Sequence, residues 1–240
     1  MAQAAKIPNL AEEVKKKIST DSFAAVQWIN SLGEPKEVCE IYDQAVRDLY
    51  WSDKGAANLV TIGRAGINFC LGKSKESEAI DQKRAEEFKA QAKTIAFDVA
   101  SNSWRGWGDE GVTIARTDME AGLDAAKLNL RLAFELKKPD DKVAIAYWLL
   151  SAMQLAFAQY ETAGNSIDQA ILYAKKTKDA TQTAFCEGFK GLIQLSSGNL
   201  SAGQTAFDAA ILELKTIAND DAKGYIGQLE TAKKIFVKHT

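Results

Sequence analysis

Two side chains that stand four positions apart can bind an anion together. Arg64 and Asn68 occur in VTIGRAGINFCLG, whose apolar residues recur every three to four positions, as they do in a helix. One helical turn of separation places both side chains on the same face. A guanidinium and an amide there can donate hydrogen bonds to an anion, with charge assistance from the arginine. The alternative is a solvated or salt-bridged Arg64 and an Asn68 that packs between helices.

A second candidate site is the stretch SNSWRGWGDEG, which holds two tryptophans and an arginine. Its glycines predict a loop, and a loop this long between helices often carries function. Tryptophan and arginine are over-represented in binding hot spots. We therefore predict Trp104, Arg105 and Trp107 as binding residues, together with Arg64 and Asn68. The alternative is that both tryptophans fold back and cover the hairpin beneath them.

Residue types that support catalysis are scarce. The single histidine, His239, stands next to the C-terminus, which disfavours Ser-His, Cys-His and histidine-metal chemistry. Adjacent acidic residues point in different directions on a helix, and most fall at expected helix starts, where they favour the helix dipole. No GxxxxGK loop is present, and no GxGxxG follows a strand. We therefore predict no catalytic residue, no metal site, no cofactor and no enzymatic activity.

The alternative class is a small-molecule-binding or enzymatic helical domain. It would use arginines such as Arg64, Arg116 and Arg131 with acidic residues in an enclosed pocket. That class predicts a deep cavity in which several of these charges converge.

Charge and apolar content indicate a folded protein with protein partners. The chain has 30 basic and 32 acidic residues, a balance that argues against nucleic-acid binding. No stretch approaches the roughly 18 continuous apolar residues of a membrane helix, and the N-terminus lacks the apolar region of a signal peptide. We expect a cytoplasmic protein that binds a protein or peptide and neither nucleic acid nor membrane.

The cysteines support the same compartment. Cys39, Cys70 and Cys186 are odd in number, far apart and without CxxC spacing, which disfavours a zinc site or a disulfide framework. Each stands among apolar residues at helical spacing, so we expect three buried thiols. Buried free thiols suit a reducing compartment.

Helical periodicity runs through almost the whole chain, and strand-type alternation is absent. We expect an all-α protein of about ten or eleven helices. Gly164-Asn165 and Gly198-Asn199 are expected to form the turns of two hairpins, 34 residues apart. The expected helices cover approximately 10–18, 22–32, 35–51, 56–71, 75–101, a segment after the loop that ends at 138, 140–162, 166–177, 180–196, 200–217 and 221–238.

The segment GLIQLSSGNLSAGQTAFDAA resembles a tetratricopeptide unit. In that family a small residue allows close helix approach, a glycine closes the turn, and a small residue, an aromatic and an alanine pack the second helix. The residues at the corresponding spacings are Gly191, Gly198, Gly203, Phe207 and Ala210. A looser match precedes this unit, so the resemblance is clearest over residues 140–217.

The resemblance implies a right-handed solenoid of antiparallel helical hairpins. It implies a single domain over residues 1–240, irregular over 1–110 and more regular over 111–238, with a C-terminal capping helix. The implied function is a non-enzymatic scaffold that binds a peptide or protein on its concave face. Tetratricopeptide domains that clamp a peptide's C-terminal carboxylate use a basic residue and an asparagine at the spacing of Arg64 and Asn68. Self-association into a homo-oligomer is a further alternative.

The segment TAFDAAILEL also resembles the C-terminal region of the 14-3-3 phosphopeptide-binding family. Chain length and the acidic pI agree with that resemblance. The phosphate-binding arginine and lysine helices of that family, and its mid-chain Arg-Tyr pair, have no counterpart in this chain. We therefore favour the tetratricopeptide-like interpretation.

Overall fold

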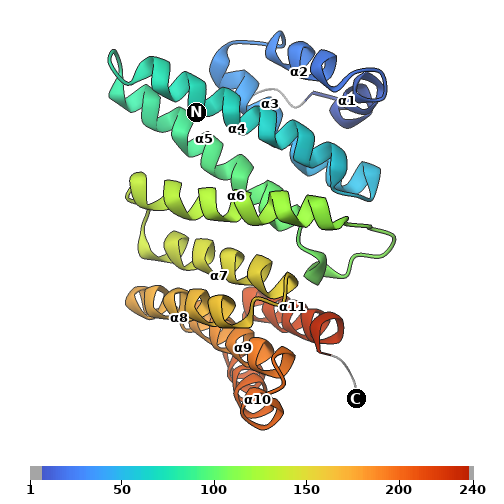
Figure 1. Ribbon diagram of the computed structural model, residues 1–240. Coiled ribbons are helices and arrows are strands. Elements are labelled where there is room, and N and C mark those ends of the chain that lie inside the picture. The colour runs from blue at the N-terminus through green and yellow to red at the C-terminus, as the bar shows by residue number, and fades with distance from the viewer. Residues whose placement is uncertain (1–6, 238–240) are drawn as a thin grey trace. The chain divides into compact units, whose positions relative to one another are not determined.

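The computed structural model describes residues 7–237, which form eleven α-helices and one short 3-10 helix (Figure 1). The described residues contain no β-strand, so the predicted all-α class and helix number are confirmed over this range. His239 and the predicted end of the last helix at residue 238 lie outside it. The helices are α1 (Leu10–Ile18), α2 (Ser22–Asn30), α3 (Pro35–Asp53), α4 (Ala57–Ser77), α5 (Gln82–Asn102), η1 (Arg105–Trp107), α6 (Arg116–Glu135), α7 (Asp140–Ala156), α8 (Tyr160–Thr177), α9 (Ala180–Ser196), α10 (Leu200–Ile217) and α11 (Asp220–Phe236).

The chain divides into two compact units. Unit 1 holds α1–α6, and unit 2 holds η1 and α7–α11. The boundary falls after Leu136, and residues 104–110 belong to unit 2 although they precede α6 in the chain. The sequence predicted a single domain whose helical hairpins become more regular after residue 110. None of the helices between residues 7 and 237 is long and apolar enough to cross a membrane.

In unit 1, α4 packs against both α3 and α5, and α3 and α5 also pack directly on each other. Glycines on α4 make the close approach possible. A β-carbon at Gly66 would lie 2.7 Å from the Tyr42 ring, and one at Gly63 would overlap Val99 of α5. Tyr42 is fully buried, and its hydroxyl donates a 2.8 Å hydrogen bond to Asn30 of α2.

A disulfide between Cys39 and Cys70 joins α3 to α4. The expectation of three free thiols is therefore wrong for this pair, and only Cys186 is a buried free thiol. The two cysteines are 31 positions apart in sequence, but helix packing brings their α-carbons to 6.0 Å, within the ordinary range for a disulfide. The cysteine argument for a reducing compartment loses its basis with this bond.

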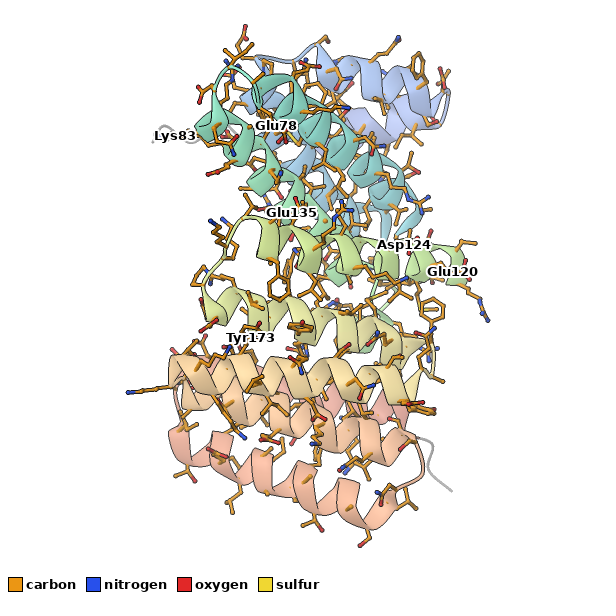
Figure 2. The ribbon with its side chains drawn as sticks, turned by 60° about the vertical axis from the view of Figure 1, so that its left-hand side comes forward. Glu78, Lys83, Glu120, Asp124, Glu135 and Tyr173 are labelled. Carbon is orange, nitrogen blue, oxygen red and sulfur yellow. A yellow bond between two sulfur atoms is a disulfide. The ribbon has the colours of Figure 1, made fainter. Side chains whose placement is uncertain are left out.

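A lysine in the first half of α5 contacts acidic residues from two other segments of unit 1. The Lys89 ammonium lies 3.9 Å from the carboxylate of Glu78, after α4, and 3.3 Å from that of Glu135, at the end of α6. Figure 2 labels both glutamates. Glu120 and Asp124, on the exposed face of α6, pair with Arg116 and Lys127 of the same helix. These pairs are solvent-exposed, so each contributes little to stability.

Unit 2 is a regular repeat of helical hairpins. Its helices begin at 20-residue intervals, so each hairpin spans 40 residues. The first residues are Asp140, Tyr160, Ala180, Leu200 and Asp220. The backbone takes a left-handed conformation at equivalent places in the two hairpins. These residues are Ala158 and Gly198 between paired helices, and Lys178 and Ala218 after them.

The predicted turn at Gly164-Asn165 is wrong, and with it the 34-residue spacing of turns. Gly164 lies inside α8, where an added β-carbon would meet nothing within 4 Å. The real turn passes through Ala158, at φ 55°, a position where the sequence offers no glycine to mark it. A single interior glycine is tolerated in a helix at a cost of about 1 kcal/mol. For a similar reason α4 continues past Gly72 to Ser77 instead of ending there.

The second hairpin turn and its packing are confirmed. Gly198 closes the turn between α9 and α10 at φ 94°. A β-carbon on Gly191 would lie 2.6 Å from the backbone nitrogen of Phe207, and one on Gly203 would lie 2.6 Å from that of Leu195. Backbones this close require glycine on both helices. Phe207 and Ala210 are buried in the same interface, as their positions in the sequence predicted.

Candidate functional site

The predicted anion-binding pair lies on the solvent face of α4. Arg64 and Asn68 are both exposed, on the side of the helix opposite the residues that pack against α3 and α5. Within residues 7–237 Arg64 forms no ion pair, so of the two interpretations the solvated one describes its state in this structure. Neither residue lines the grooves described below.

The arginines of the alternative hypothesis do not converge. Arg116 and Arg131 are exposed on α6 and pair with Glu120 at 3.2 Å and Glu135 at 3.4 Å, each one turn further along. Fifteen residues of helix separate the two arginines by about 22 Å. One pocket cannot enclose both of them.

Trp104 is a core residue of unit 2. Its side chain is fully buried, and its ring centroid lies about 6 Å from those of Trp148, Phe189 and Phe236. Gly106 packs directly beneath the indole and leaves no room for a β-carbon. The glycine-rich segment thus folds back on its own unit, as the alternative interpretation had it, and Trp104 is not available to a partner in this conformation.

The other two residues of this segment remain at the surface. Arg105 is exposed, and its guanidinium carbon lies 5.0 Å from the centroid of the Phe236 ring. Trp107 is half-buried and packs edge-on against Trp104, with ring centroids 5.2 Å apart. Of the three predicted binding residues of this segment, Arg105 and Trp107 are therefore the two that reach the surface.

The polar site that the sequence did not predict is a seam between α3 and α5. Lys36 pairs with Glu87 at 3.9 Å, and Arg47 pairs with Asp98 at 3.2 Å. In each pair the two residues are 51 positions apart in the sequence, so α3 and α5 run parallel and in register. The same offset aligns Glu40 with Gln91 and Asp43 with Thr94. The seam extends about 16 Å along α3.

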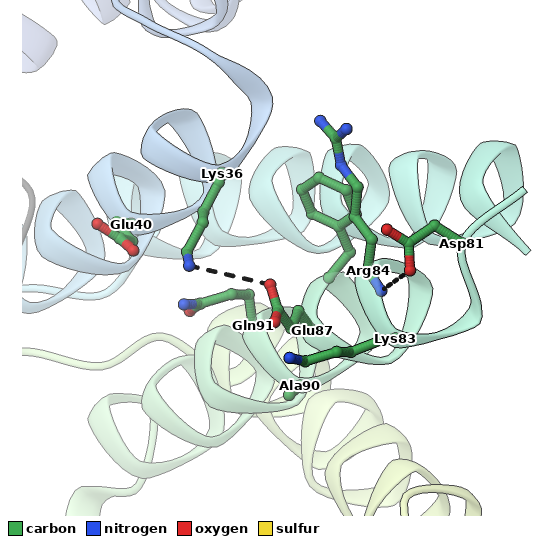
Figure 3. Close-up of a pocket in the computed structure, with 9 residues that line it drawn as sticks. Lys36, Glu40, Asp81, Lys83, Arg84, Glu87, Ala90 and Gln91 are labelled. Carbon is green, nitrogen blue, oxygen red and sulfur yellow. Dashed lines mark hydrogen bonds and ion pairs between the residues drawn. The ribbon is translucent and has the colours of Figure 1, made fainter. Parts of the chain in front are cut away.

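A groove of about 610 Å³ opens at the Lys36 end of this seam (Figure 3). Four of its side chains have no polar partner among the described residues. These side chains are Glu40, Lys83, Arg84 and Gln91. The Arg84 guanidinium carbon lies 5.6 Å from the centroid of the Phe88 ring, and Phe88 forms an apolar part of the groove wall. The groove therefore offers free charges of both signs and an amide beside a small apolar surface.

A smaller hollow of about 240 Å³ adjoins the groove and shares Asp81, Arg84 and Phe88 with it. Its wall includes Ile80, whose side chain is 89% exposed in the turn between α4 and α5. An isoleucine this exposed gains nothing from the fold of its own chain. The two hollows together form a continuous surface around Arg84.

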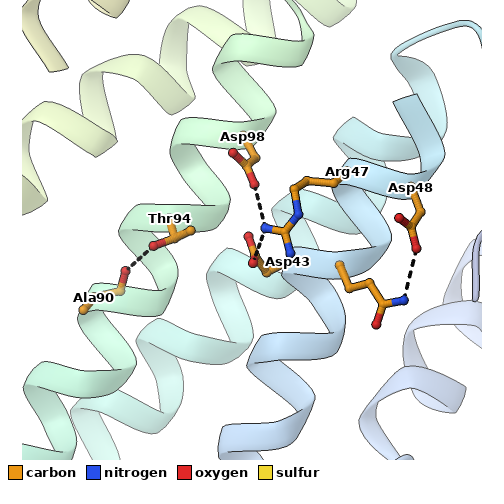
Figure 4. A network of polar contacts seen from close by, with 7 residues as sticks. Asp43, Arg47, Asp48, Ala90, Thr94 and Asp98 are labelled. Carbon is orange, nitrogen blue, oxygen red and sulfur yellow. Dashed lines mark hydrogen bonds and ion pairs between the residues drawn. The ribbon is translucent and has the colours of Figure 1, made fainter. Parts of the chain in front are cut away.

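At the other end of the seam, Arg47 holds two carboxyl groups (Figure 4). Its guanidinium contacts Asp43 of its own helix and Asp98 of α5, and both acidic side chains are largely buried. Burial first, and then the charge and hydrogen bond of Asp43, raise the pKa of Asp98 to about 7, although the charge and hydrogen bond of Arg47 lower it. Below about pH 7 Asp98 therefore keeps its proton, and the contacts of Arg47 with Asp43 and Asp98 join α3 to α5.

Part of this seam could have been detected in the sequence. Its members recur at intervals of four, three and four residues on each helix, which is the spacing of one helix face. The sequence does not reveal that α3 packs against α5, because α4 lies between these two helices in the chain. Asp43 and Asp98 are not adjacent in the sequence, because this pair of acids comes from two helices.

Among residues 7–237, no three His, Cys, Asp or Glu side chains lie close enough together to hold a metal ion. In comparisons with known proteins, no family model matches this chain, and no curated protein is similar to it. The site must therefore be interpreted from its own geometry. That geometry combines free charges of both signs, an amide and an apolar wall along a parallel helix pair.

Proposed function

We propose that this protein is a non-enzymatic, tetratricopeptide-like scaffold that binds a peptide segment of a partner protein in the groove between α3 and α5. The observation that carries the proposal is the groove's set of side chains without polar partners. Glu40, Lys83, Arg84 and Gln91 surround one cavity of about 610 Å³ and leave their hydrogen-bonding groups unused within the described residues. Charged groups that face each other across a groove favour a ligand of complementary charge pattern.

The size of the groove fits a short stretch of chain. An extended peptide advances about 3.3 Å per residue, so a seam of about 16 Å accommodates about five residues. A basic side chain of the ligand would meet Glu40, and an acidic one would meet Lys83 or Arg84. Gln91 can donate to a ligand carbonyl and accept from a ligand amide.

Repeat architecture supports a scaffold role. In helical-repeat proteins, helices of alternate position form one layer, and that layer presents the binding surface. In unit 1, α3 and α5 pack on each other in this alternate manner, as do α9 and α11 in unit 2. The 40-residue hairpins of unit 2 are longer than the tetratricopeptide unit, so the proposed likeness is one of stacking and not of repeat length.

Peptide selection tests this proposal. A displayed library of random peptides about ten residues long, enough to overfill the seam, is selected on the full chain. Affinities of the selected peptides are then measured for the original chain, for Arg84→Glu and for Arg64→Glu. Both arginines are exposed, lie on helices and lack ion pairs, so the two variants are matched in fold and charge.

We expect Arg84→Glu to weaken binding by at least about tenfold, equivalent to about 1.4 kcal/mol, while Arg64→Glu retains it. The opposite pattern would transfer the binding site to the Arg64 and Asn68 face of α4. If the selected peptides bind both variants equally well, the groove between α3 and α5 is not a peptide site.

A further inference from the structure

Unit 2 carries a second groove, of about 430 Å³, between η1 and α11. Trp107 forms one wall, and the first half of α11 forms the other with Tyr225 and Asp221. Gly224 and Gly227 also line the groove, and because they have no side chain they expose the backbone of α11 there. The groove lies wholly within unit 2 and shares no residue with the α3–α5 seam.

The two glycines of α11 have no role in the packing of their own chain. A β-carbon at either position would meet nothing within 4 Å. Gly188 of α9 contrasts with them, because its β-carbon would lie 2.7 Å from Leu229. A glycine inside a helix costs about 1 kcal/mol relative to alanine, and at Gly224 and Gly227 no contact within the chain offsets that cost. Glycine at both positions leaves this part of the groove free of side chains.

The aromatic walls are held rigidly. Tyr225 stacks on Phe185 with ring centroids 4.1 Å apart, and Phe185 in turn packs against Trp148. Trp107 is fixed edge-on against the buried Trp104. Rings that are already ordered lose little entropy when a ligand binds, and the face of an aromatic ring attracts a cation.

The charge of the groove is negative. Its walls include Asp220 and Asp221 but no basic residue. Asp220 is paired with Lys223 at 3.0 Å, whereas Asp221 has no ion pair among the described residues. The carboxylate of Asp221 lies near the Tyr225 hydroxyl, whose pKa is raised first by burial and then by this charge. A cation in the groove would thus meet both aromatic faces and an uncompensated carboxylate.

We propose that this groove binds an arginine or lysine side chain from an exposed segment of a partner protein. The cationic head group lies against Trp107 or Tyr225 and pairs with Asp221, and the aliphatic stem crosses the bare backbone at Gly224 and Gly227. Aromatic faces that flank a carboxylate are a recurrent way to recognise a protein-borne cation. This second site is independent of the proposed peptide groove in unit 1, so either one can fail alone.

The probe is a capped pentapeptide with a central arginine between glycines, compared with the same peptide carrying citrulline. Citrulline has nearly the shape of arginine but no charge. Nuclear magnetic resonance of the full chain follows the Trp107 indole and the amides of Gly224 and Gly227 during titration. The variants are Asp221→Asn and Gly227→Leu. The control is Gly72→Leu on α4, where an added β-carbon also meets nothing.

We expect saturable chemical-shift changes at Trp107, Gly224 and Gly227 with the arginine peptide and none with the citrulline peptide. Asp221→Asn weakens binding about fivefold, as expected for one partly exposed charge contact. Gly227→Leu abolishes binding with no loss of thermal stability, and Gly72→Leu changes neither. Equal shifts with citrulline, or shifts that persist in Gly227→Leu, overturn the proposal. Shifts at the same positions that grow with protein concentration alone would place a second copy of the chain in the groove and also overturn it.

Discussion

Asp98 is the residue in the α3–α5 seam whose charge depends most on pH near neutrality. Its carboxyl group keeps a proton up to about pH 7 in the folded chain, against an ordinary pKa of 3.8. Between these values the folded protein binds more protons than the unfolded chain, so this group makes stability fall as pH rises. The loss stops above about pH 7, where both states have released the proton.

Asp98→Asn is expected to remove this part of the pH dependence. Between pH 5 and 7 the free energy of unfolding of the original chain, relative to the variant, is predicted to fall by about 1 kcal/mol per pH unit. Urea unfolding at several pH values measures it. Asp48→Asn is the control, because Asp48 accepts a hydrogen bond from Gln44 outside the Arg47 cluster. A constant difference between the original chain and Asp98→Asn across this range would contradict the raised pKa of Asp98.

Trp104 and Trp107 are expected to differ sharply when replaced by alanine. Trp104→Ala removes a fully buried indole and should reduce the free energy of unfolding by about 3–5 kcal/mol. Trp107→Ala removes a half-buried ring and should cost clearly less. Chemical denaturation of each variant gives the comparison. Equal losses would mean that Trp104 is not the anchor of the segment.

At the residue scale, the sequence predicted which residues share a helix face better than it predicted what surrounds each residue. It marked Arg64 and Asn68 as sharing one face, which the exposed positions on α4 bear out, but a face does not reveal its ligand. The sequence did not decide whether Trp104 is buried or exposed, because its burial depends on Phe189 and Phe236, which lie far along the chain. Long-range partners of this kind carry no local signal.

At the scale of helices, the packing in unit 2 depends on the positions of the glycines and on the atoms that lie opposite them. In α9 and α10, Gly191 and Gly203 allow backbones to touch, whereas Gly224 in α11 faces open space. The same substitution should therefore have opposite effects. Gly191→Ala or Gly203→Ala is expected to destabilise unit 2 by about 2 kcal/mol through overpacking. Gly224→Ala is expected to stabilise it by up to about 1 kcal/mol through helix propensity.

Thermal and urea unfolding of these three variants measure the effect. Gly164→Ala is the matched control inside α8, where a β-carbon also meets nothing. A loss of stability in Gly224→Ala comparable to that in Gly191→Ala would show that α11 packs more tightly than its geometry indicates.

The presence of the helices followed from apolar periodicity, but of the two predicted hairpin turns only the one at Gly198 was marked correctly by its glycine. The helices from Ala180 and Leu200 were predicted at their observed bounds, because polar caps flank a strong apolar pattern. The turn at Ala158 was missed, because packing on both sides imposes a left-handed conformation there on an alanine. Tertiary contacts overrode the local preference of both Ala158 and Gly164.

At the scale of the whole molecule, the Cys39–Cys70 disulfide is the covalent link of unit 1. Closing a loop of about this size stabilises a fold by about 3.7 kcal/mol, chiefly by restricting the unfolded chain. Reduction should lower the free energy of unfolding by this amount and speed amide hydrogen exchange in α3 and α4. The variant Cys39→Ala/Cys70→Ala is the control, since reductant should not affect it. Unchanged stability of the original chain under reductant would contradict the prediction.

The measurement that tests the central claim most directly is a charge-swap cycle between the α3–α5 groove and a selected peptide. Glu40→Lys in the protein is combined with a lysine-to-glutamate change in the peptide, and all four affinities are measured. Direct contact predicts that each single change weakens binding and that the double change restores it, with a coupling energy of at least about 1 kcal/mol. Additive effects, with coupling below about 0.3 kcal/mol, would contradict peptide binding at Glu40 and with it the proposed groove.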